Sequence, residues 1–413
     1  MRNSKNPPSI SSALVILPAL FVLSLAIACG SGDVSGSKPN DVPPTVFSPT
    51  LPNGAKIPSC GTTMALMTVS PITQATMTGW VPLGNLGPPG HLFPTDHQYL
   101  YVNRPANGNA TATINTVPVV APANIIITGA HHTHYSASNL DDYTLDFALC
   151  DEVRGTFGHI AALTPDLLQD LGAFDQQCYS YDLGLNNGST FSGCYTKPAG
   201  ISRSVGVQVA SAGGQTSIAL DFWLHDTRRA PLAYANAVRW NASNPQAYTV
   251  AASDYFSEPA RSEIRARLGN YNGTMLRTVE PLGGAIAYDV AGTLRGLWVN
   301  AAQTSVPEAA HLAFVPDNVD PTMLSVSMGT SQPDFAAGLY QYTPLPNGYV
   351  NRDPAQITSD GHIYCFETGQ GRGVILAQME TAISVKVEGR SGYVTCANQL
   401  PFVFSGKTFV YVR

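Results

Sequence analysis

The chain has 413 residues and a net charge of −6, because 22 Lys and Arg stand against 28 Asp and Glu. Charged residues make up 12%, about half of the roughly 25% that globular proteins carry. The scarcity of cations argues against nucleic-acid binding, and 44% hydrophobic residues exclude a wholly disordered chain. With 37 Gly and 31 Pro, helix bundles are excluded and short strands joined by turns are favoured. The length predicts two or three domains.

The N-terminus has the pattern of an export signal. Arg2 and Lys5 precede an apolar run over residues 13–27, which is shorter than a bilayer span and ends in small residues. We therefore expect residues 1–28 to be a signal peptide. The sequence Leu-Ala-Ile-Ala-Cys that ends at Cys29 resembles the bacterial lipobox, and this resemblance implies lipidation of that cysteine. A plain signal peptide without lipidation is the alternative.

The following segment, residues 29–55, is rich in Gly, Ser, Pro and Asp, which predicts a flexible tether. No later run approaches the length of a transmembrane helix. We therefore expect an exported protein of the bacterial cell envelope, held at a membrane by its lipid anchor.

Six cysteines follow Cys29, and an even number in an exported chain indicates disulfides. They are Cys60, Cys150, Cys178, Cys194, Cys365 and Cys396. The last two lie alone in the C-terminal third and are expected to pair. Of the other four, Cys178 and Cys194 make the simplest local bridge, and the pairing of the remaining two is left open. The spacings do not predict a zinc site made of thiolates.

Short strands dominate residues 56–240, which we expect to form one β-domain. Candidate strands, several of them alternating or β-branched, span residues 99–102, 113–117, 124–128, 143–149, 206–211 and 216–223. One short helix interrupts them, with Thr164 as its cap, Pro165 in its first turn and Gly172 after its end.

A second helix is expected from Glu258 to Leu268, within a connector that spans residues 241–276. Residues 277–413 again favour strands and predict a second, smaller β-domain, either closed or a sandwich. Candidate strands there span residues 285–289, 296–300, 310–315, 363–367, 374–378, 383–387 and 408–412. The predicted fold class is therefore mainly β, with two β-domains and short helices between them.

Ionisable side chains are concentrated between Gly90 and His97. Two imidazoles, of His91 and His97, and the carboxylate of Asp96 can converge if the chain turns at Pro94 and enters a strand at His97. A zinc site needs about three such nitrogen or oxygen ligands and an open position for water. The segment alone is also typical of an ordinary turn, so its surroundings decide between the two interpretations.

The order of the segments around it resembles the core of lysostaphin-type zinc endopeptidases, over roughly residues 75–230. The segments are 120–126, 142–147, 157–160, 206–214 and 219–224. That family has an HxxxD motif, an Ala-Pro strand, a strand followed by a His-Leu pair, a Gly-rich turn and a closing HxHF strand. The resemblance implies the antiparallel β-sheet or β-sandwich core of that family and a zinc cofactor.

Residue by residue, the resemblance implies metal ligands at three positions: His91, Asp96 and Asp221, with His97 as the alternative ligand. His159 matches the catalytic histidine that orients water or stabilises the tetrahedral intermediate. Two features depart from the family. His91 lies five residues before Asp96 rather than four, and the closing HxH has become Ala219-Leu220-Asp221. Alanine can do no proton chemistry, and acidic ligands make metal-bound water less acidic, so the departures favour a degenerate member.

The remaining ionisable groups have simpler interpretations. We expect solvent exposure, without a role in chemistry, for a loop with His131, His132 and His134, for His225 and Asp226 at a strand end, and for Asp142 and Asp146. No Gly-x-Ser-x-Gly elbow or phosphate loop occurs, which excludes two common enzyme classes.

The sequence thus predicts an envelope lipoprotein with a degenerate lysostaphin-type domain that binds cell-wall peptide or an envelope partner. Two alternatives remain. One is an active zinc metalloendopeptidase that cleaves peptidoglycan cross-links, and the other is a non-enzymatic structural or carbohydrate-binding β-protein. The C-terminal domain carries no recognised enzyme motif.

Overall fold

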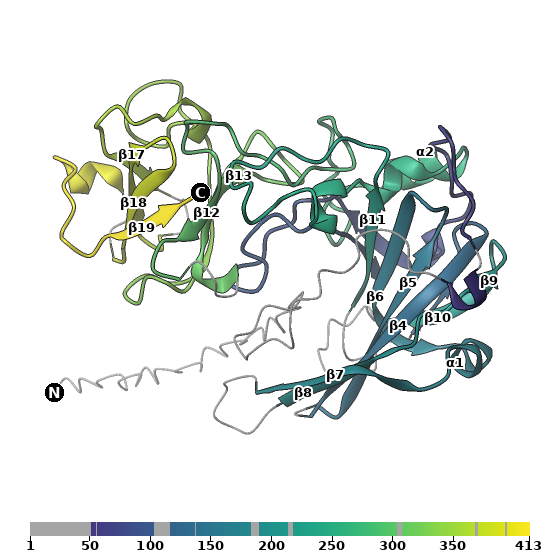
Figure 1. Cartoon of the computed structure of the whole chain (residues 1–413). Helices are drawn as coiled ribbons and strands as arrows, with labels where there is room; N and C mark the ends of the chain where they lie inside the picture. The colour runs from purple at the N-terminus through teal and green to yellow at the C-terminus, as the bar shows by residue number, and fades with distance from the viewer. Residues whose placement is uncertain are drawn as a thin grey trace, which may run out of the picture.

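The computed structural model describes residues 51–54, 56–102, 116–136, 138–182, 190–213, 218–303, 308–367, 371–392 and 395–413. Within them the chain is mainly β, as the sequence predicts, with two antiparallel sheets that form two bodies side by side (Figure 1). None of the helices in these ranges is long and apolar enough to cross a membrane. The predicted signal peptide, the predicted lipidation at Cys29, most of the predicted tether and most of the candidate strand 113–117 lie outside the described residues.

The first sheet is built from residues 77–226. Its strands are β1 (Met77–Val81), β2 (Gln98–Val102), β3 (Val117–Val120), β4 (Ile125–Tyr135), β5 (Leu140–Ala148), β6 (Val153–Leu163), β7 (Phe174–Asp182), β8 (Thr190–Thr196), β9 (Ile201–Arg203), β10 (Gln208–Ala212) and β11 (Ala219–Asp226). The main order is β1-β2-β11-β6-β5-β4-β8-β7, while β10 pairs with β3 and β6, and β9 pairs with β4. The last strand in sequence, β11, therefore lies between β2 and β6, which makes neighbours of three segments that are far apart in the chain.

Strand β11 has two chemically different faces. Successive side chains of a strand point to opposite faces, and Leu220 and Phe222 belong to the apolar core. In that core Phe222 packs edge-on against Phe157 of β6, with ring centroids 4.9 Å apart. Asp221 and Trp223 therefore point to the other face, where the candidate site lies.

Short helices flank the sheets. They are α1 (Pro165–Leu171), α2 (Ala260–Arg265) and the 3₁₀ turns Pro52–Gly54, Gln74–Thr76, Pro245–Tyr248, Ala252–Tyr255, Glu308–Ala310, Pro354–Gln356 and Cys396–Gln399. Helix α1 lies where the sequence predicts it, and Gly172 ends it with a φ of +74°. Helix α2 is shorter than the predicted 258–268. The helix ends early because the carbonyl of Arg267 and the N–H of Gly269 bond to the backbone of Trp80 in β1 instead of continuing the helix.

Strand β4 corrects one expectation of the sequence. His131, His132 and His134 do not lie in a loop, because β4 continues through them and pairs with β5 on one side and β8 on the other. A bulge near Gly129 adjusts the register on the β5 side. The three imidazoles are therefore held on a strand whose position both neighbours fix.

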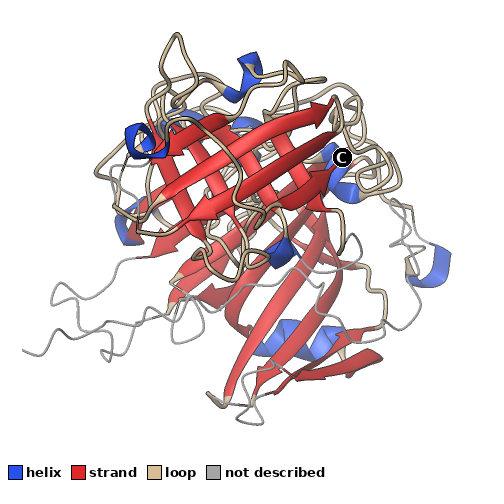
Figure 2. Cartoon of the chain, turned by 90° about the vertical axis from the view of Figure 1, so that its left-hand side faces the viewer, coloured by secondary structure: helices blue, strands red, loops and turns tan. Residues whose placement is uncertain are grey.

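The second sheet is built from residues 296–412. Its strands are β12 (Gly296–Asn300), β13 (Leu312–Pro316), β14 (Leu324–Met328), β15 (Gly338–Tyr342), β16 (Tyr364–Glu367), β17 (Val374–Thr381), β18 (Ser384–Arg390) and β19 (Phe409–Val412). The order β15-β14-β13-β12-β19-β18-β17-β16 brings the two edge strands close together, so the sheet curls nearly into a barrel (Figure 2). The candidate strand 285–289 is instead a loop, since the carboxylate of Asp289 accepts the N–H groups of Ala235 and Leu297.

A third apolar cluster joins the two bodies and fixes the loop that precedes β2. Leu92 and Phe93 of this loop pack with Trp240 and with Val315 of β13. The ring of Phe93 lies edge-on to Trp240 at 5.4 Å and is stacked on His311 at 5.7 Å. The segment from His91 to His97 is therefore positioned by the C-terminal domain as well as by its own sheet.

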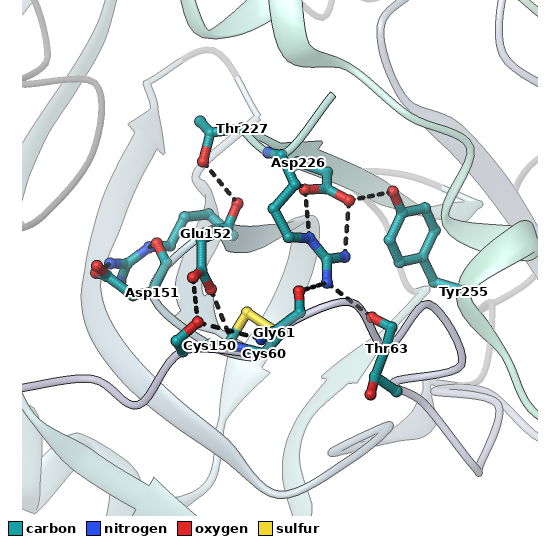
Figure 3. Close-up of a disulfide and its surroundings, with 12 residues drawn as sticks. Cys60, Gly61, Thr63, Cys150, Asp151, Glu152, Asp226, Thr227 and Tyr255 are labelled. Atoms are coloured by element: carbon teal, nitrogen blue, oxygen red, sulfur yellow. Dashed lines mark hydrogen bonds and ion pairs between the residues drawn. A yellow bond between two sulfur atoms is a disulfide. The ribbon is translucent and has the colours of Figure 1, made fainter. Parts of the chain in front are cut away.

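Three disulfides link Cys60 to Cys150, Cys178 to Cys194, and Cys365 to Cys396. The last two are the pairs that the sequence predicts. The first closes the question that the sequence left open, and it fastens the segment before β1 to the turn between β5 and β6. Arg228 supports the same segment, since its guanidinium binds Asp226 and donates to the carbonyl oxygens of Gly61 and Thr63 (Figure 3).

Candidate metal centre

Five side chains form what we call the buried cluster, with Asp221 at its centre. Asp221 Oδ2 lies 3.5 Å from His97 Nε2 and 3.4 Å from His159 Nε2. The other nitrogen of each ring contacts a further carboxylate: His97 Nδ1 lies 3.1 Å from Asp96 Oδ1, and His159 Nδ1 lies 2.8 Å from Asp142 Oδ2. Acid and imidazole therefore alternate along the cluster from Asp96 to Asp142.

A β-bulge in β6 places His159. Between the pairs Leu145–Phe157 and Tyr143–Ile160, β6 has one residue more than β5. His159 itself adopts a φ of +56°, in the left-handed region that non-glycine residues rarely occupy. Bulges of this kind redirect a side chain, and strained backbone is concentrated at functional sites. The local fold thus accepts strain at the residue that reaches Asp221.

Gly158, the residue before it, leaves room for Trp223. A Cβ at Gly158 would lie 2.8 Å from an atom of the Trp223 ring, closer than real contacts allow. The indole packs on the imidazole of His97, with ring centroids 4.1 Å apart, and its N–H donates to Asp96 Oδ1 at 2.8 Å. Trp223 therefore fixes both His97 and the carboxylate behind it.

Burial and the neighbouring charges act differently on the ionisable groups. Burial raises the pKa of Asp221, although the imidazoles of His159 and His97 lower it in part. Burial would also raise the pKa of Asp96, but the hydrogen bond and the charge of His97 outweigh it and lower that pKa. His91 lies edge-on to His97 at 5.7 Å, and burial lowers its pKa to about 4. A neutral His91 offers a nitrogen lone pair beside the cluster at neutral pH.

The cluster contains buried polar atoms that lack a hydrogen-bond partner among the described residues. These atoms are His97 Nε2, Asp221 Oδ1 and Asp142 Oδ1. Such atoms are uncommon, and each costs roughly 1–3 kcal/mol. A cation would satisfy them, because metal-bound histidines normally have a carboxylate on the second ring nitrogen, as both imidazoles have here. The donor set of two imidazoles and one carboxylate fits Zn²⁺.

In this arrangement the two imidazole rings lie too far apart to bind one metal ion together. Within the described ranges, the group of three candidate ligands whose atoms all lie within 4.8 Å of one another is Cys60, Cys150 and Glu152. Its sulfurs are joined in a disulfide and cannot bind a metal (Figure 3). The three ligand atoms of the buried cluster do not meet this limit. Each Nε2 atom lies within 3.5 Å of Asp221 Oδ2, so the distance that exceeds 4.8 Å is the one between the two Nε2 atoms. Zinc–nitrogen bonds of about 2.0–2.1 Å would require the two rings to move closer together.

The structure brings together all the residues that the sequence analysis singled out for chemistry, but in altered positions. His97 and Asp221 lie in direct contact, while Asp96 contacts the opposite nitrogen of His97. His91 lies edge-on to His97 rather than at the centre of the cluster. Asp142 corrects an expectation: it is buried against His159 rather than solvated, and only the pairing of β5 with β6 reveals this.

A small open pocket of about 270 Å³ adjoins the cluster on the side of Asp96. Its lining includes the indole of Trp223, the imidazole of His225 and the side chains of Asn244 and Gln246. His225, expected at a solvated strand end, is instead partly buried, and burial lowers its pKa. The pocket therefore offers an aromatic surface and several neutral hydrogen-bonding groups.

Comparisons of this chain with protein-family models, with curated proteins and with solved structures found no match.

Proposed function

We propose that this chain is an exported envelope lipoprotein whose first domain binds a divalent metal, with zinc the best fit, and holds a cell-wall peptide or an envelope partner beside it. The observation that carries the proposal is the position of Asp221, whose Oδ2 lies within 3.5 Å of the Nε2 atoms of His97 and His159. Asp96 and Asp142 contact the other two ring nitrogens. The metal would be held by His97, His159 and Asp221, with Asp96 and Asp142 orienting the imidazoles.

Charge balance supports this assignment. Three carboxylates surround two imidazoles, and the metal-free cluster keeps a net charge of −1 when both rings are doubly protonated. A divalent cation bound to two neutral imidazoles leaves the same net charge. Because an imidazole binds a metal only in its neutral form, protons compete with the metal for both rings.

The residues around the proposed metal position favour binding without hydrolysis. If His159 is a ligand, it cannot act as a general base. In the lysostaphin-type endopeptidases that the sequence resembles, the first histidine of the closing HxH strand is catalytic. Its place here is taken by Ala219, which is buried against Val81 and Tyr99 and has no titratable group. Three nearby carboxylates also reduce the acidity of metal-bound water. In the pocket beside Asp96, the side-chain amide oxygens of Asn244 and Gln246 already accept hydrogen bonds from the protein, so their NH₂ groups would donate to peptide carbonyls.

The test is zinc content together with peptide binding. The mature protein, dialysed against zinc and then buffer, should retain one tightly bound ion and bind muropeptides without cleaving them. Asp221→Asn should lose both properties. Asp146→Asn is the matched control, because Asp146 is an acidic residue of β5 in the same sheet whose carboxylate accepts from Thr156 instead. Equal zinc content in wild type and Asp221→Asn would contradict the proposal.

An active zinc endopeptidase is the second candidate. In that arrangement His91, His97 and Asp221 hold the metal, and His159 acts as the base. The contact of His159 Nδ1 with Asp142 at 2.8 Å favours it, since a carboxylate at this position orients a catalytic imidazole. His159→Gln separates the two candidates. Loss of zinc supports binding alone, whereas retained zinc with lost muropeptide cleavage supports the enzyme.

The lipoprotein part of the proposal rests on the export signal and on the three disulfides, which are typical of oxidising compartments. Cys29→Ser should release the protein from the membrane fraction into the soluble fraction, while leaving zinc binding unchanged. A variant that stays in the membrane fraction would contradict lipidation at Cys29.

A further inference from the structure

A second group of histidines and a carboxylate lies on the β4–β5 hairpin, where Asp141 points to the opposite face of β5 from its neighbour Asp142. His132 and His134 are two residues apart on β4, so their side chains share one face. Asp141 of β5 is paired directly with His134. His132 Nε2 and His134 Nδ1 lie 2.8 and 2.9 Å from the same atom, Asp141 Oδ1. We call these three residues the hairpin cluster.

The side chains of the hairpin cluster are open to solvent, and their backbone is held by paired strands. Its side chains are exposed by 30% for His132, 37% for His134 and 51% for Asp141. The ring of His132 is stacked on Tyr143, with centroids 4.8 Å apart. Because β4 is paired on both edges in this region, the Cα positions of the two histidines are fixed. The ligands are thus held on rigid strands but remain open to solvent.

We propose that the hairpin cluster is a second metal site, which takes a borderline transition-metal ion such as Zn²⁺, Ni²⁺ or Cu²⁺. Imidazole nitrogens and a carboxylate oxygen suit these ions. Asp141 Oδ1 already lies within 3 Å of both nitrogens. The three atoms do not all lie within 4.8 Å of one another, so the two imidazoles must turn inward around a bound ion. Their exposure allows this movement without repacking a core.

Three protein ligands leave at least one coordination position open. In solution water would fill it, and a donor atom of another molecule could replace that water. The site does not rest on the function proposed above, because it shares no residue with the buried cluster.

The two sites can be separated by counting metal ions. Calorimetric titration of the mature protein with zinc at pH 7.5 should give two sites per chain. His132→Gln/His134→Gln should reduce this to one and leave the tighter site unchanged, whereas Asp221→Asn should remove only the tighter one. The control is His362→Gln, since His362 is also an exposed histidine beside an aspartate, Asp360, but has no second imidazole there.

With Cu²⁺, electron paramagnetic resonance should show nitrogen hyperfine splitting from the hairpin cluster, lost in the double variant and kept in His362→Gln. The inference would be overturned if the wild type had no zinc site that depends on His132 and His134. It would also be overturned if the dissociation constant of that site were above about 10 µM.

Discussion

The buried cluster and the hairpin cluster use the same groups in different surroundings. In each, one aspartate oxygen lies between two imidazoles, but the Asp221 side chain is 2% exposed and that of Asp141 is 51% exposed. Burial raises the pKa of Asp221 despite its two histidines. For Asp141 burial also raises the pKa, but the hydrogen bonds and charges of His134 and His132 together outweigh it and lower the pKa. Burial therefore prevails at Asp221, whose contacts with the imidazoles are 3.4 and 3.5 Å long, whereas the shorter hydrogen bonds prevail at Asp141.

The largest expected effect is the loss of the central carboxylate of the buried cluster. Asp221→Asn removes a negatively charged ligand from a dry site, where an ion pair is screened little by solvent. We expect zinc affinity to fall by more than about 100-fold. Loss of a residue that only orients a metal ligand typically lowers the affinity about 10- to 100-fold. Competition with a chromophoric chelator measures it. Asp146→Asn should bind as wild type, and a comparable loss in that control would indicate general damage to the sheet.

The next effect concerns the carboxylates behind the imidazoles. Asp142→Asn keeps the size of the side chain but removes the charge that orients His159, and we expect zinc affinity to fall about 10- to 100-fold. Asp96→Asn should behave similarly through His97, since the indole of Trp223 can still donate to the remaining amide oxygen. Competition titrations at several pH values measure both variants. An unchanged affinity in both would mean that His97 and His159 are not ligands.

The third effect is a pH dependence of stability in the metal-free protein. Since the folded-state pKa of Asp221 is raised above its unfolded value of about 3.9, ionising this residue costs free energy only in the folded state. As the pH rises from about 4, wild type should therefore lose stability relative to Asp221→Asn, until the pH exceeds the folded-state pKa. Urea unfolding of both proteins with a chelator, between pH 4 and 8, measures the difference. If wild type instead gained stability relative to Asp221→Asn as the pH rises over this range, the raised pKa would be contradicted.

The fold could be predicted further than the site. Alternating and β-branched segments indicated most strands, and Pro165 with Gly172 bounded helix α1, because these signals act within a few residues. Helix α2 and the loop 285–289 were misjudged because distant partners decide them. Trp80 takes the backbone groups that would lengthen the helix, and the side chain of Asp289 bonds to two loop and strand amides.

At the site, sequence order was enough to select His91, Asp96, His97, His159 and Asp221 as one group. It could not show which nitrogen each carboxylate contacts, because that depends on strand register and on the bulge at His159. For the same reason Asp142 was assigned to solvent, although Tyr143 beside it pairs with Ile160 and so brings Asp142 next to His159. His132 and His134 were placed in a loop because their pairing with β5 and β8 is a long-range property.

The smallest expected effect sharpens the comparison from the exposed side. Asp141→Asn removes the charge from two contacts of 2.8 and 2.9 Å, as short as the buried contact between His159 and Asp142. Exposed pairs of this kind nevertheless contribute less than about 1 kcal/mol to stability. We therefore expect the free energy of unfolding without metal to change by less than that, and the change to disappear in high salt. Urea unfolding at low and high salt measures it. If Asp141→Asn cost as much as a buried substitution, burial would not be the property that separates the two clusters.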